Sequence, residues 1–599
     1  MNNLDLKAIN KNRKHIPMVL KQDTFGSLVD IAITNRHIDN KEIWKNGVLR
    51  QINFKAIYGL KYVNEYLQDI KIHNVKTMVL VDPDGDGFTS SSLIINYFKR
   101  ALNVDVKPLL PDIKIHGIAQ YIKRFPDKFH NHKTKDTWII IPDSSSNDLD
   151  TIKELYDKGY KCLIIDHHDM SDKVQSKIFS SDIYKVISDQ YEQYPICREY
   201  TGVGMSYLVA RYIDKQLGLN YAKDYLDLAA AGQISDVSNL TLGNIHDMVM
   251  YGLNNIHNPF IKTYLSHDDT SVSIKSIQFG LVPLMNAVSR IGDMTDRKLL
   301  LKALSDVDNN DEYIYTTKKK TPSGHFKKIE IHTNLYEYAY FMLKKVKSLQ
   351  DRTVKKAVSK LDIKVYDQLV VAILPNKYNA GLTGLIANKL ISSYNLPSFV
   401  FIHHKDAMIG SGRVPEEISG IREFANQLDA TIFAQGHDNA FGIKIKYLDD
   451  FIHQFEATIS DTIDYNADTY KYKIDELYVD KIPSGKDCVD VYNNSLLWCG
   501  VKDEPVIGIV GLKLDEEHVF IKNRLLRINA DNGVTLISFV APKDVIDKLS
   551  ENKNTYVDIV GKPNLNFFLH KSTPQIVIDK IKITDKVINS NDMFNNLEF

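Results

Sequence analysis

Short apolar runs that end in acidic residues recur through the first third of the chain. The first run, residues 76–81 (KTMVLV), follows a segment at residues 49–70 in which apolar positions recur at helical spacing. Similar runs cover residues 137–141 and 161–165, with a helical pattern over residues 149–158 between them. Buried strands that alternate with helices are typical of a parallel α/β sheet. In such sheets polar sites lie beyond the carboxyl ends of the strands, so we expect the acidic residues to meet there.

The middle of the chain predicts a connector followed by a second α/β unit. Residues 335–361 are periodic and contain neither proline nor glycine, which predicts a long helix between two lobes. A strand pattern follows at residues 369–375 (LVVAILP), then a glycine-containing turn and helix at residues 379–392. Residues 397–402 (PSFVFI) predict the next strand.

From about Tyr470 onward the pattern changes to short strands separated by turn residues. Clear examples are residues 534–540 (VTLISFV), 556–560 (YVDIV) and 575–583 (QIVIDKIKI). Many short strands in a small region are typical of a β-barrel, and we predict an OB-like fold here.

The length of the chain agrees with several domains. Its 599 residues exceed what a single hydrophobic core usually supports. The changes of pattern predict an N-terminal extension, a parallel-sheet α/β domain, a helical connector, a second α/β domain and an OB-like domain. The predicted bounds are residues 1–50, 51–260, 261–364, 365–460 and 468–590.

Composition indicates an ordinary globular protein. Hydrophobic residues make up 44% of the chain and charged residues 25%. Residues 1–20 lack the apolar core of a signal peptide, and no apolar run elsewhere is long enough for a membrane span, so we expect a cytoplasmic protein without a membrane partner. The four cysteines form no C-x-x-C pair and predict neither a zinc site nor disulfides. They are Cys162, Cys197, Cys488 and Cys499.

Charge does not by itself indicate nucleic-acid binding. Lysine plus arginine equals aspartate plus glutamate, at 75 each. Local patches rather than net charge contact phosphates, so basic residues could still line a channel. A lysine-rich stretch at residues 318–328 contains Pro322 and Gly324, which predicts a solvent-exposed loop.

The strongest chemical signal is the sequence DPDGDG, directly after the first apolar run. It places Asp82, Asp84 and Asp86 at alternate positions. Burying three like charges together costs several kcal/mol unless cations compensate them. A calcium EF-hand loop begins similarly, but its twelfth position needs a glutamate and here is Leu93, and a strand rather than a helix precedes it. The EF-hand interpretation is therefore excluded.

Three further segments supply metal-ligand residue types. Asp143 follows the second run, Asp166-His167-His168 follows the third, and Asp236 lies in the sequence QISDVSNL. Any single aspartate could cap a helix or a turn, but the set in this order favours a metal centre. Mixed Asp and His ligation suits manganese, and magnesium less well. With this many carboxylates, two ions about 3.5 to 4 Å apart are favoured over one, an arrangement that suits in-line displacement at phosphorus.

These four segments resemble motifs I to IV of the DHH phosphoesterase superfamily, each expected at the end of a strand. For one metal ion the resemblance implies the ligands Asp82, Asp84 and Asp143. For the second ion it implies the ligands Asp86, Asp143, His167 and Asp236. It further implies that Asp143 bridges the two ions, that His168 faces the scissile phosphate and that Asp166 orients the histidine pair.

Later segments resemble RecJ proteins of the same superfamily. Residues 283–290 (PLMNAVSR) resemble a P-R-I-N-A-A-G-R stretch, and residues 379–390 resemble the glycine-rich helix start of the DHH-associated domain. Residues 410–413 (GSGR) and 435–437 (QGH) resemble its G-S-x-R and G-G-H motifs. The resemblance implies a phosphate clamp formed by Asn286, Arg290, Ser411, Arg413 and His437.

Three departures from these family motifs leave the details of end recognition open. Leu284 and Ser289 replace an arginine and a glycine, and Gln435 replaces a glycine. The metal-ligand set is unaffected.

The RecJ resemblance covers most of the chain and implies a function. It implies a single-stranded-DNA-specific exonuclease that releases mononucleotides in the 5′ to 3′ direction by two-metal hydrolysis with Mn²⁺ or Mg²⁺. It associates the chain with DNA repair and recombination, with a single-strand-binding protein or helicase as further partner candidates and a monomer as the default state.

Two alternatives stay open. Shorter relatives cleave oligoribonucleotides or cyclic dinucleotides, but the additional β-rich region from about Tyr470 favours a polymer substrate. Some relatives are non-catalytic scaffolds at replication forks, but these lose metal ligands, and every ligand type is present here.

Overall fold

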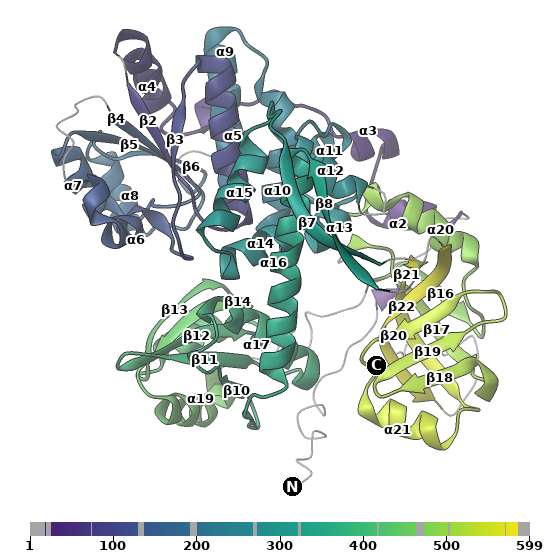
Figure 1. Ribbon diagram of the computed structural model, residues 1–599. Helices are drawn as coiled ribbons and strands as arrows, with labels where there is room; N and C mark the ends of the chain where they lie inside the picture. Colours follow the sequence, from purple (N-terminus) through teal and green to yellow (C-terminus); the bar gives the residue numbers. More distant parts are fainter. Residues whose placement is uncertain are drawn as a thin grey trace. The chain divides into compact units, whose positions relative to one another are not determined.

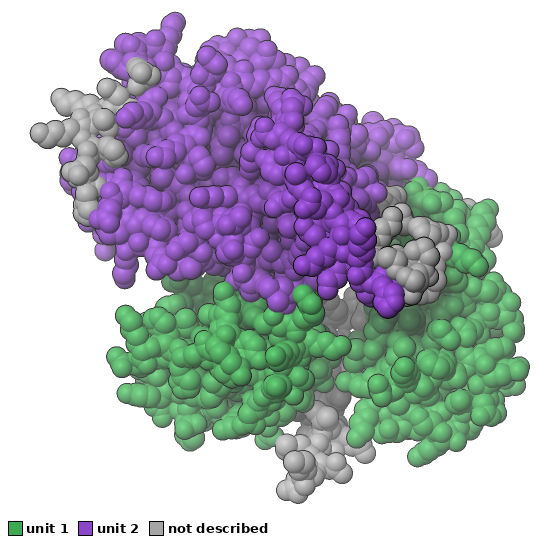
Figure 2. Space-filling model, viewed as in Figure 1, with its two compact units in different colours: residues 1–39, 351–495, 503–599 green, residues 40–350, 496–502 purple. Residues whose placement is uncertain are grey.

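A computed structural model shows the arrangement of the chain (Figure 1). It describes residues 18–19, 26–73, 75–129, 137–191, 200–267, 272–320, 325–415, 418–462, 473–500, 503–568 and 571–584. The chain divides into two compact units (Figure 2). Unit 2 comprises residues 40–350 and 496–502, and unit 1 comprises residues 1–39, 351–495 and 503–599. The individual domain boundaries proposed above stay predictions.

Unit 2 contains the predicted parallel sheet. Its five strands follow the order β3-β2-β4-β5-β6, and every neighbouring pair is parallel. The strands are β2 (Lys76–Leu80), β3 (Val106–Leu109), β4 (Thr137–Pro142), β5 (Tyr160–Asp166) and β6 (Lys185–Ser188). All six residues of β4 are buried, as expected for a central strand that is covered on both faces. The predicted α/β fold class is therefore confirmed.

Helices cover both faces of this sheet because alternate strand residues point to opposite sides. Trp138 and Ile140 join the core formed with α4, α5 and α9, whereas Ile139 and Ile141 join the core formed with α6, α7 and α8. These helices are α4 (Lys61–Ile72), α5 (Gly85–Leu102), α6 (Gly117–Arg124), α7 (Leu149–Asp157), α8 (Asp172–Phe179) and α9 (Gly202–Leu217). The predicted helix at residues 49–70 is wrong in its first part, where only a 3-10 turn, η1 (Phe54–Ala56), precedes α4.

The rest of unit 2 is mainly helical. Its helices are α3 (Lys41–Asn46), α10 (Leu226–Ser235), α11 (Gly243–Asn254), α12 (Pro259–Ser266), α13 (Ile274–Ser276), α14 (Val282–Ile291) and α15 (Met294–Ser305). A π-helical turn, η4 (Ile277–Leu281), joins α13 to α14. Short 3-10 turns are η2 (Pro126–Phe129) and η3 (Ala222–Tyr225). The long helix α16 (Leu335–Val358) confirms the predicted connector helix and ends slightly earlier than predicted.

The lysine-rich stretch is not the exposed loop that we predicted. Apart from His325, its described residues belong to two antiparallel strands, β7 (Tyr313–Lys320) and β8 (Phe326–Thr333). Pro322 and Gly324 lie outside the described residues. The base of this hairpin packs on α16, where the rings of Tyr315 and Phe341 lie 5.1 Å apart. This aromatic packing stabilises strands whose outer residues are too polar to show a strand pattern.

Unit 1 contains a six-stranded sheet with the order β13-β14-β12-β11-β10-β9. Only β10 and β11 are parallel, and α17 connects them as predicted for an α/β unit. The strands are β9 (Ile363–Val365), β10 (Val370–Ile373), β11 (Ser398–His404), β12 (Ala407–Arg413), β13 (Thr431–His437) and β14 (Ala440–Ile445). The helices are η5 (Ala380–Leu382), α17 (Thr383–Tyr394), α18 (Ile421–Gln427) and α19 (Leu448–Thr462).

The C-terminal part of unit 1 forms a seven-stranded mixed sheet with the order β16-β17-β21-β22-β20-β19-β18. Its strands are β16 (Glu476–Val479), β17 (Ile507–Lys513), β18 (Val519–Lys522), β19 (Leu525–Asn529), β20 (Thr535–Ser538), β21 (Tyr556–Phe568) and β22 (Lys571–Thr584). Its helices are α20 (Gly485–Asn493), η8 (Glu516–His518) and α21 (Lys543–Glu551), and the 3-10 turn η6 (Ser495–Leu497) lies at the boundary with unit 2. Among the described residues the edge strands β16 and β18 do not pair with each other, so the OB-like barrel stays a prediction.

The segment predicted as one N-terminal extension contributes to both units. In unit 1, β1 (Met18–Val19) pairs with β15 (Lys473–Ile474), and Arg36 after α2 (Leu28–Asn35) forms an ion pair with the buried Asp475 at 2.7 Å. In unit 2, the indole N–H of Trp44 on α3 donates to the carbonyl of Leu497. No described helix combines the length and the apolar character that crossing a bilayer requires.

Candidate metal centre

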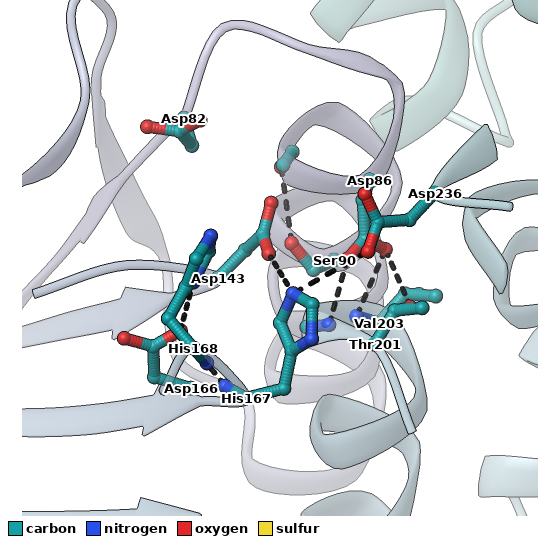
Figure 3. A network of polar contacts seen from close by, with 12 residues as sticks. Asp82, Asp86, Ser90, Asp143, Asp166, His167, His168, Thr201, Val203 and Asp236 are labelled. Atoms are coloured by element: carbon teal, nitrogen blue, oxygen red, sulfur yellow. Dashed lines mark hydrogen bonds and ion pairs between the residues drawn. The ribbon is translucent and has the colours of Figure 1, made fainter. Parts of the chain in front are cut away.

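The carboxyl edge of the parallel sheet gathers the predicted acidic residues (Figure 3). Asp82 lies just beyond β2, Asp143 directly follows β4, and Asp166 is the last residue of β5. Since β2, β4 and β5 are neighbours in the sheet, the three carboxylates come from adjacent strand ends. All three are buried.

The loop after β2 brings Asp82 and Asp84 to the amino end of α5. Asp84 caps this helix, and its side chain accepts a hydrogen bond of 3.0 Å from the backbone N–H of Gly87. Gly87 must be a glycine because a Cβ there would lie 2.5 Å from the Cβ of Asp82. Oδ1 of Asp82 is buried and has no hydrogen bond of suitable geometry within the described part of the chain, although Nδ1 of His116 lies 3.1 Å away.

Asp86 lies in the first turn of α5 and points towards the start of α9. Its carboxylate accepts hydrogen bonds from the hydroxyl of Thr201 at 3.0 Å and from the backbone N–H groups of Gly202 at 2.6 Å and Val203 at 3.1 Å. Burial, followed by the charges of Asp236 and Asp84, raises the pKa of Asp86 to about 7.

Asp143 has an unusual backbone conformation, with φ at 63°. This left-handed conformation is costly for most residues but is tolerated by aspartate. Nε2 of His167 lies 3.2 Å from Oδ1 of Asp143 and 3.7 Å from Oδ2 of Asp236. Burial and then the charges of Asp86 and Asp84 raise the pKa of Asp143 well above its ordinary value. An added cation would reverse this effect.

The Asp166-His167-His168 segment forms a hydrogen-bonded frame. Oδ2 of Asp166 accepts bonds from the backbone N–H and the hydroxyl of Ser146, at 2.9 and 2.7 Å. Oδ1 lies 2.7 Å from Nδ1 of His168 and accepts from the backbone N–H of His167. Burial disfavours both charged groups, but their mutual attraction outweighs it. The attraction between Asp166 and His168 raises the pKa of His168 to about 10 and holds the pKa of Asp166 well below its ordinary range.

Asp236 reaches the same site from a different kind of element. We expected it at a strand end, but it is the C-cap residue of helix α10. The next residue, Val237, has φ at 54°, which is rare for a β-branched residue. This strained turn ends the helix and leaves Asp236 beside His167.

The donor atoms form two overlapping groups that fit divalent cations. Potential ligand atoms of Asp82, Asp84 and Asp143 lie within 4.8 Å of one another, and the same holds for Asp143, His167 and His168. Asp143 is common to both groups, as a bridging ligand would be. Carboxylate oxygens with imidazole nitrogens suit Mn²⁺, and the unsatisfied Oδ1 of Asp82 is a further place for a cation. Neither group contains Asp86 or Asp236, and the second contains His168, which the resemblance assigns to the substrate, so the ligand assignments stay predictions.

Asn286 and Arg290 lie one turn apart on α14, so they share one face of that helix. Burial lowers the pKa of Arg290, while the charge of Asp84 acts in the opposite direction. This electrostatic influence places the guanidinium in the field of the acidic centre. Arg290 therefore lies near the acidic centre, and the contact of either residue with a substrate phosphate stays a prediction.

The other three predicted phosphate-binding residues lie on one face of the sheet in unit 1. Arg413 on β12 and His437 on β13 are each paired with Ala440 of the intervening strand β14, so all three side chains are on one face of the sheet. Ser411 shares this face, and its hydroxyl lies 2.9 Å from that of Thr383 at the start of α17. A helix amino terminus beside serine, arginine and histidine side chains is suited to an anion.

Two residues near the acidic centre escaped the sequence analysis. His116 contacts Asp82 and lies with its ring 4.7 Å from that of His168. Asp189 follows β6, at the same edge of the sheet, and burial raises its pKa to about 7. Asp189 directly follows β6, so the rule that led to Asp143 would have indicated it, but β6 is short and we did not recognise it as a strand. His116 lies well beyond the end of β3 and carries no such signal in the sequence.

A comparison with protein families finds a match for one segment of the chain. Residues 76–233 match the DHH family, N-terminal domain. This range begins at β2 and ends in α10, and it contains all the predicted metal ligands except Asp236. The chain therefore contains a DHH-family domain, and the resemblance stated from the motifs is confirmed.

Individual relatives extend the similarity over most of the chain. It is 26% identical over 532 residues to the putative SPbeta prophage-derived single-strand DNA-specific exonuclease YorK of Bacillus subtilis, covering 85% of this chain and 87% of that protein. It is 22% identical over 387 residues to the single-stranded-DNA-specific exonuclease RecJ of Thermus thermophilus, covering 64% of this chain and 52% of that protein.

Solved structures show the same fold. The crystal structure of RecJ in complex with Mn²⁺ from Thermus thermophilus aligns with a TM-score of 0.66 and 17% identity, covering 94% of this chain and 76% of that one. The crystal structure of the same RecJ in complex with Mg²⁺ aligns with a TM-score of 0.62 and 16% identity, covering 93% of this chain and 75% of that one.

Proposed function

We propose that this protein is a metal-dependent exonuclease that hydrolyses single-stranded DNA from the 5′ end and releases mononucleotides. The observation that carries the proposal is the pair of overlapping ligand groups that share Asp143. The names of the relatives support the substrate class, since YorK and RecJ are both named as single-strand DNA-specific exonucleases. The structures of RecJ with Mn²⁺ and with Mg²⁺ support the use of either ion.

Two ions are proposed, with ligand sets that share Asp143. Asp82, Asp84 and Asp143 would hold one ion, and Asp86, Asp143, His167 and Asp236 would hold the other. When bound, the ions would supply Lewis acidity towards a phosphodiester. The protein frame supplies the orientation: Asp84 is fixed at the start of α5, and Asp143 is fixed by its backbone turn and by Gly202.

His168 is proposed to face the scissile phosphate as a positioned cation. Asp166 fixes the ring through Nδ1, which leaves Nε2 as the nitrogen that donates to a phosphate oxygen. Since Ser146 and two backbone N–H groups bind Asp166, the orientation of the ring does not depend on substrate. Such preorganised charge favours the transition state of phosphoryl transfer.

Substrate phosphates further along the DNA strand are assigned to polar and basic residues outside the ligand set. Asn286 and Arg290 would contact phosphates near the acidic centre. Ser411, Arg413 and His437, which share a sheet face beside the amino end of α17, would form a second phosphate site.

The test is the digestion of single-stranded DNA labelled at either end, with Mn²⁺, Mg²⁺ or EDTA. We expect metal-dependent mononucleotide release from the 5′ end that is lost in Asp143→Ala. Asp157→Ala, which changes an exposed aspartate of α7, is the matched control and should retain activity.

Parallel digests distinguish the alternative functions. Duplex DNA, single-stranded RNA and a dinucleotide are digested under the same conditions. Cleavage of the dinucleotide alone would assign the protein to the small-substrate branch of the superfamily. Tight metal binding without hydrolysis of any substrate would leave the scaffold role as the better description.

A further inference from the structure

The hairpin β7/β8 carries an unusual concentration of like charge. Within its distal half, Lys318, Lys327 and Lys328 are all exposed. The strand register places Lys318 directly opposite Lys328 and Lys319 directly opposite Lys327. Lys318 and Lys328 therefore lie side by side on one face of the ribbon, and Lys327 lies on the other face.

Directly opposed like charges destabilise an antiparallel pair. Side chains at such positions have Cβ atoms about 4.5 to 5.5 Å apart, and like charges there are unfavourable. Among the residues that the structure describes, the side chains of Lys318, Lys327 and Lys328 take part in no ion pair or hydrogen bond. At the base of the same hairpin, by contrast, His332 contacts Glu312 at 3.0 Å. Compensation of charge is thus present at the base and missing at the lysines.

An exposed aromatic ring accompanies these lysines. Phe326, the first residue of β8, is 68% exposed and pairs with Lys320 across the ribbon. The aromatic residues at the base of the hairpin are packed, since Tyr315 is buried against α16. Phe326 makes no ring contact among the described residues and presents a free π-face next to the basic side chains.

We propose that this hairpin is a binding site for single-stranded nucleic acid. Lys318 and Lys328 bind phosphates on the face of the ribbon that carries Phe326, Lys327 binds a phosphate where the strand passes to the other face, and Phe326 stacks on an unpaired base. Lysines beside an exposed aromatic ring are the combination that binds single strands without sequence preference. An acidic protein would satisfy the lysines but would leave the ring without a stacking partner. The inference rests on the proposed function and adds a second contact surface, outside the acidic centre, for the same class of substrate.

The test measures binding rather than hydrolysis. The affinity of the full chain for fluorescein-labelled oligothymidylate is measured by fluorescence anisotropy in EDTA, across a salt series. The variant combines Lys318→Gln, Lys327→Gln and Lys328→Gln. The control combines Lys71→Gln, Lys76→Gln and Lys158→Gln, which are exposed lysines of unit 2 near the amino ends of the sheet strands.

The hairpin variant should bind about tenfold or more weakly at low salt. The slope of the logarithm of the association constant against the logarithm of the salt concentration is negative, and its magnitude should decrease by about 2. Each of the three lost phosphate contacts contributes about 0.7 to this magnitude for a single strand. The control, with the same change in net charge, should retain wild-type affinity and slope. The melting temperature of the hairpin variant should not decrease, because the substitutions remove unfavourable pairs, so a loss of binding cannot be attributed to unfolding.

A second variant separates nucleic acid from other polyanions. Phe326→Ala should weaken binding several-fold without changing the salt slope, because stacking releases no counterions. Poly-glutamate should compete poorly. Equal losses in the hairpin and control variants, effective competition by poly-glutamate, or equal binding of duplex with no effect of Phe326→Ala would each overturn the inference. Hydrolysis of single-stranded DNA without lysine-dependent binding would overturn only the inference about the hairpin. Lysine-dependent binding without hydrolysis would overturn only the proposed function.

Discussion

The acidic centre and the lysine hairpin both gather like charges in unit 2, but in opposite relation to solvent. Asp82 and Asp143 are buried at the end of a parallel sheet, and hydrogen bonds or tight backbone turns hold their neighbours in place. Lys318 and Lys328 stand opposite each other on a two-stranded ribbon and are exposed. One cluster is shielded from water, and the other is surrounded by it.

This difference determines what each cluster requires. Burial and mutual repulsion raise the pKa values of Asp86 and Asp143, so their ionised forms need a cation bound within the site. Water solvates the exposed lysines, and repulsion between them costs little. The buried acidic cluster therefore requires a bound cation, whereas the exposed lysine cluster is stable without a ligand and can bind a polyanion transiently.

The largest expected effect comes from removing the carboxylate common to both ligand groups. Asp143→Asn should lower the rate of hydrolysis by roughly 10³-fold, since metal ions contribute several kcal/mol to such reactions. In the wild type, Mn²⁺ at about 100 times its Kd should add about 2.7 kcal/mol of stability, and the variant should lose most of this gain. Calorimetry with and without Mn²⁺ measures it. An undiminished Mn²⁺ effect in the variant would break the comparison, because the buried charges would then not require a cation.

Asp166→Asn should have the next largest effect. Residues that orient a ligand or a catalytic histidine typically contribute 10- to 100-fold, and we expect a rate loss of about that size. Without the carboxylate the pKa of His168 should fall from about 10 towards its ordinary value. The ring resonances of His168, followed by NMR titration in EDTA, report the change. An unchanged titration would show that Asp166 does not hold the charge of this ring.

Gly202→Ala tests how tightly the frame surrounds Asp143. The new Cβ would overlap the Cβ of Asp143 and lie 2.5 Å from its Oδ1. We expect a loss of roughly 1–3 kcal/mol in the free energy of unfolding, as for other overpacked sites, together with weaker Mn²⁺ binding. Gly243→Ala is the control, since its Cβ would make only ordinary contacts with Arg50. Equal effects of both substitutions would argue against a specific frame.

Asp189 offers a buried carboxylate outside the proposed ligand set, and its effect should be the smallest. It is fully buried, and its Oδ2 has no hydrogen-bond partner among the described residues. Because burial raises its pKa to about 7, the folded state holds a proton that the unfolded state loses above about pH 4. Stability from this group is therefore present at low pH and is lost as the pH rises through about 7.

Asp189→Asn should remove this loss. We expect the variant to be at least about 1 kcal/mol more stable than the wild type at pH 8, with the difference shrinking towards pH 4. Urea denaturation at several pH values measures it. A variant that is less stable at pH 8 would show that the ionised carboxylate has a compensating partner.

The predictability of the molecule follows the range of the interactions involved. The strands β2, β4 and β5 appear as apolar runs because both of their faces are buried, and this pattern is local. The short strand β3, with two exposed residues among its four, carries no such pattern, so we did not recognise it. The hairpin escaped for the same reason, because only the packing of its base on α16 makes strands of the lysine-rich stretch.

The sequence by itself determined the order of the acidic motifs and placed three of them at strand ends, because alternating buried strands and helices leave the carboxyl edge of a parallel sheet as their common position. Only the tertiary structure decided which atoms share a site. The left-handed turn of Asp143, its contact with Gly202 and the approach of Asp236 from the end of a helix depend on contacts between segments far apart in the chain. Local patterns cannot encode such contacts, because they arise only when separate elements pack together.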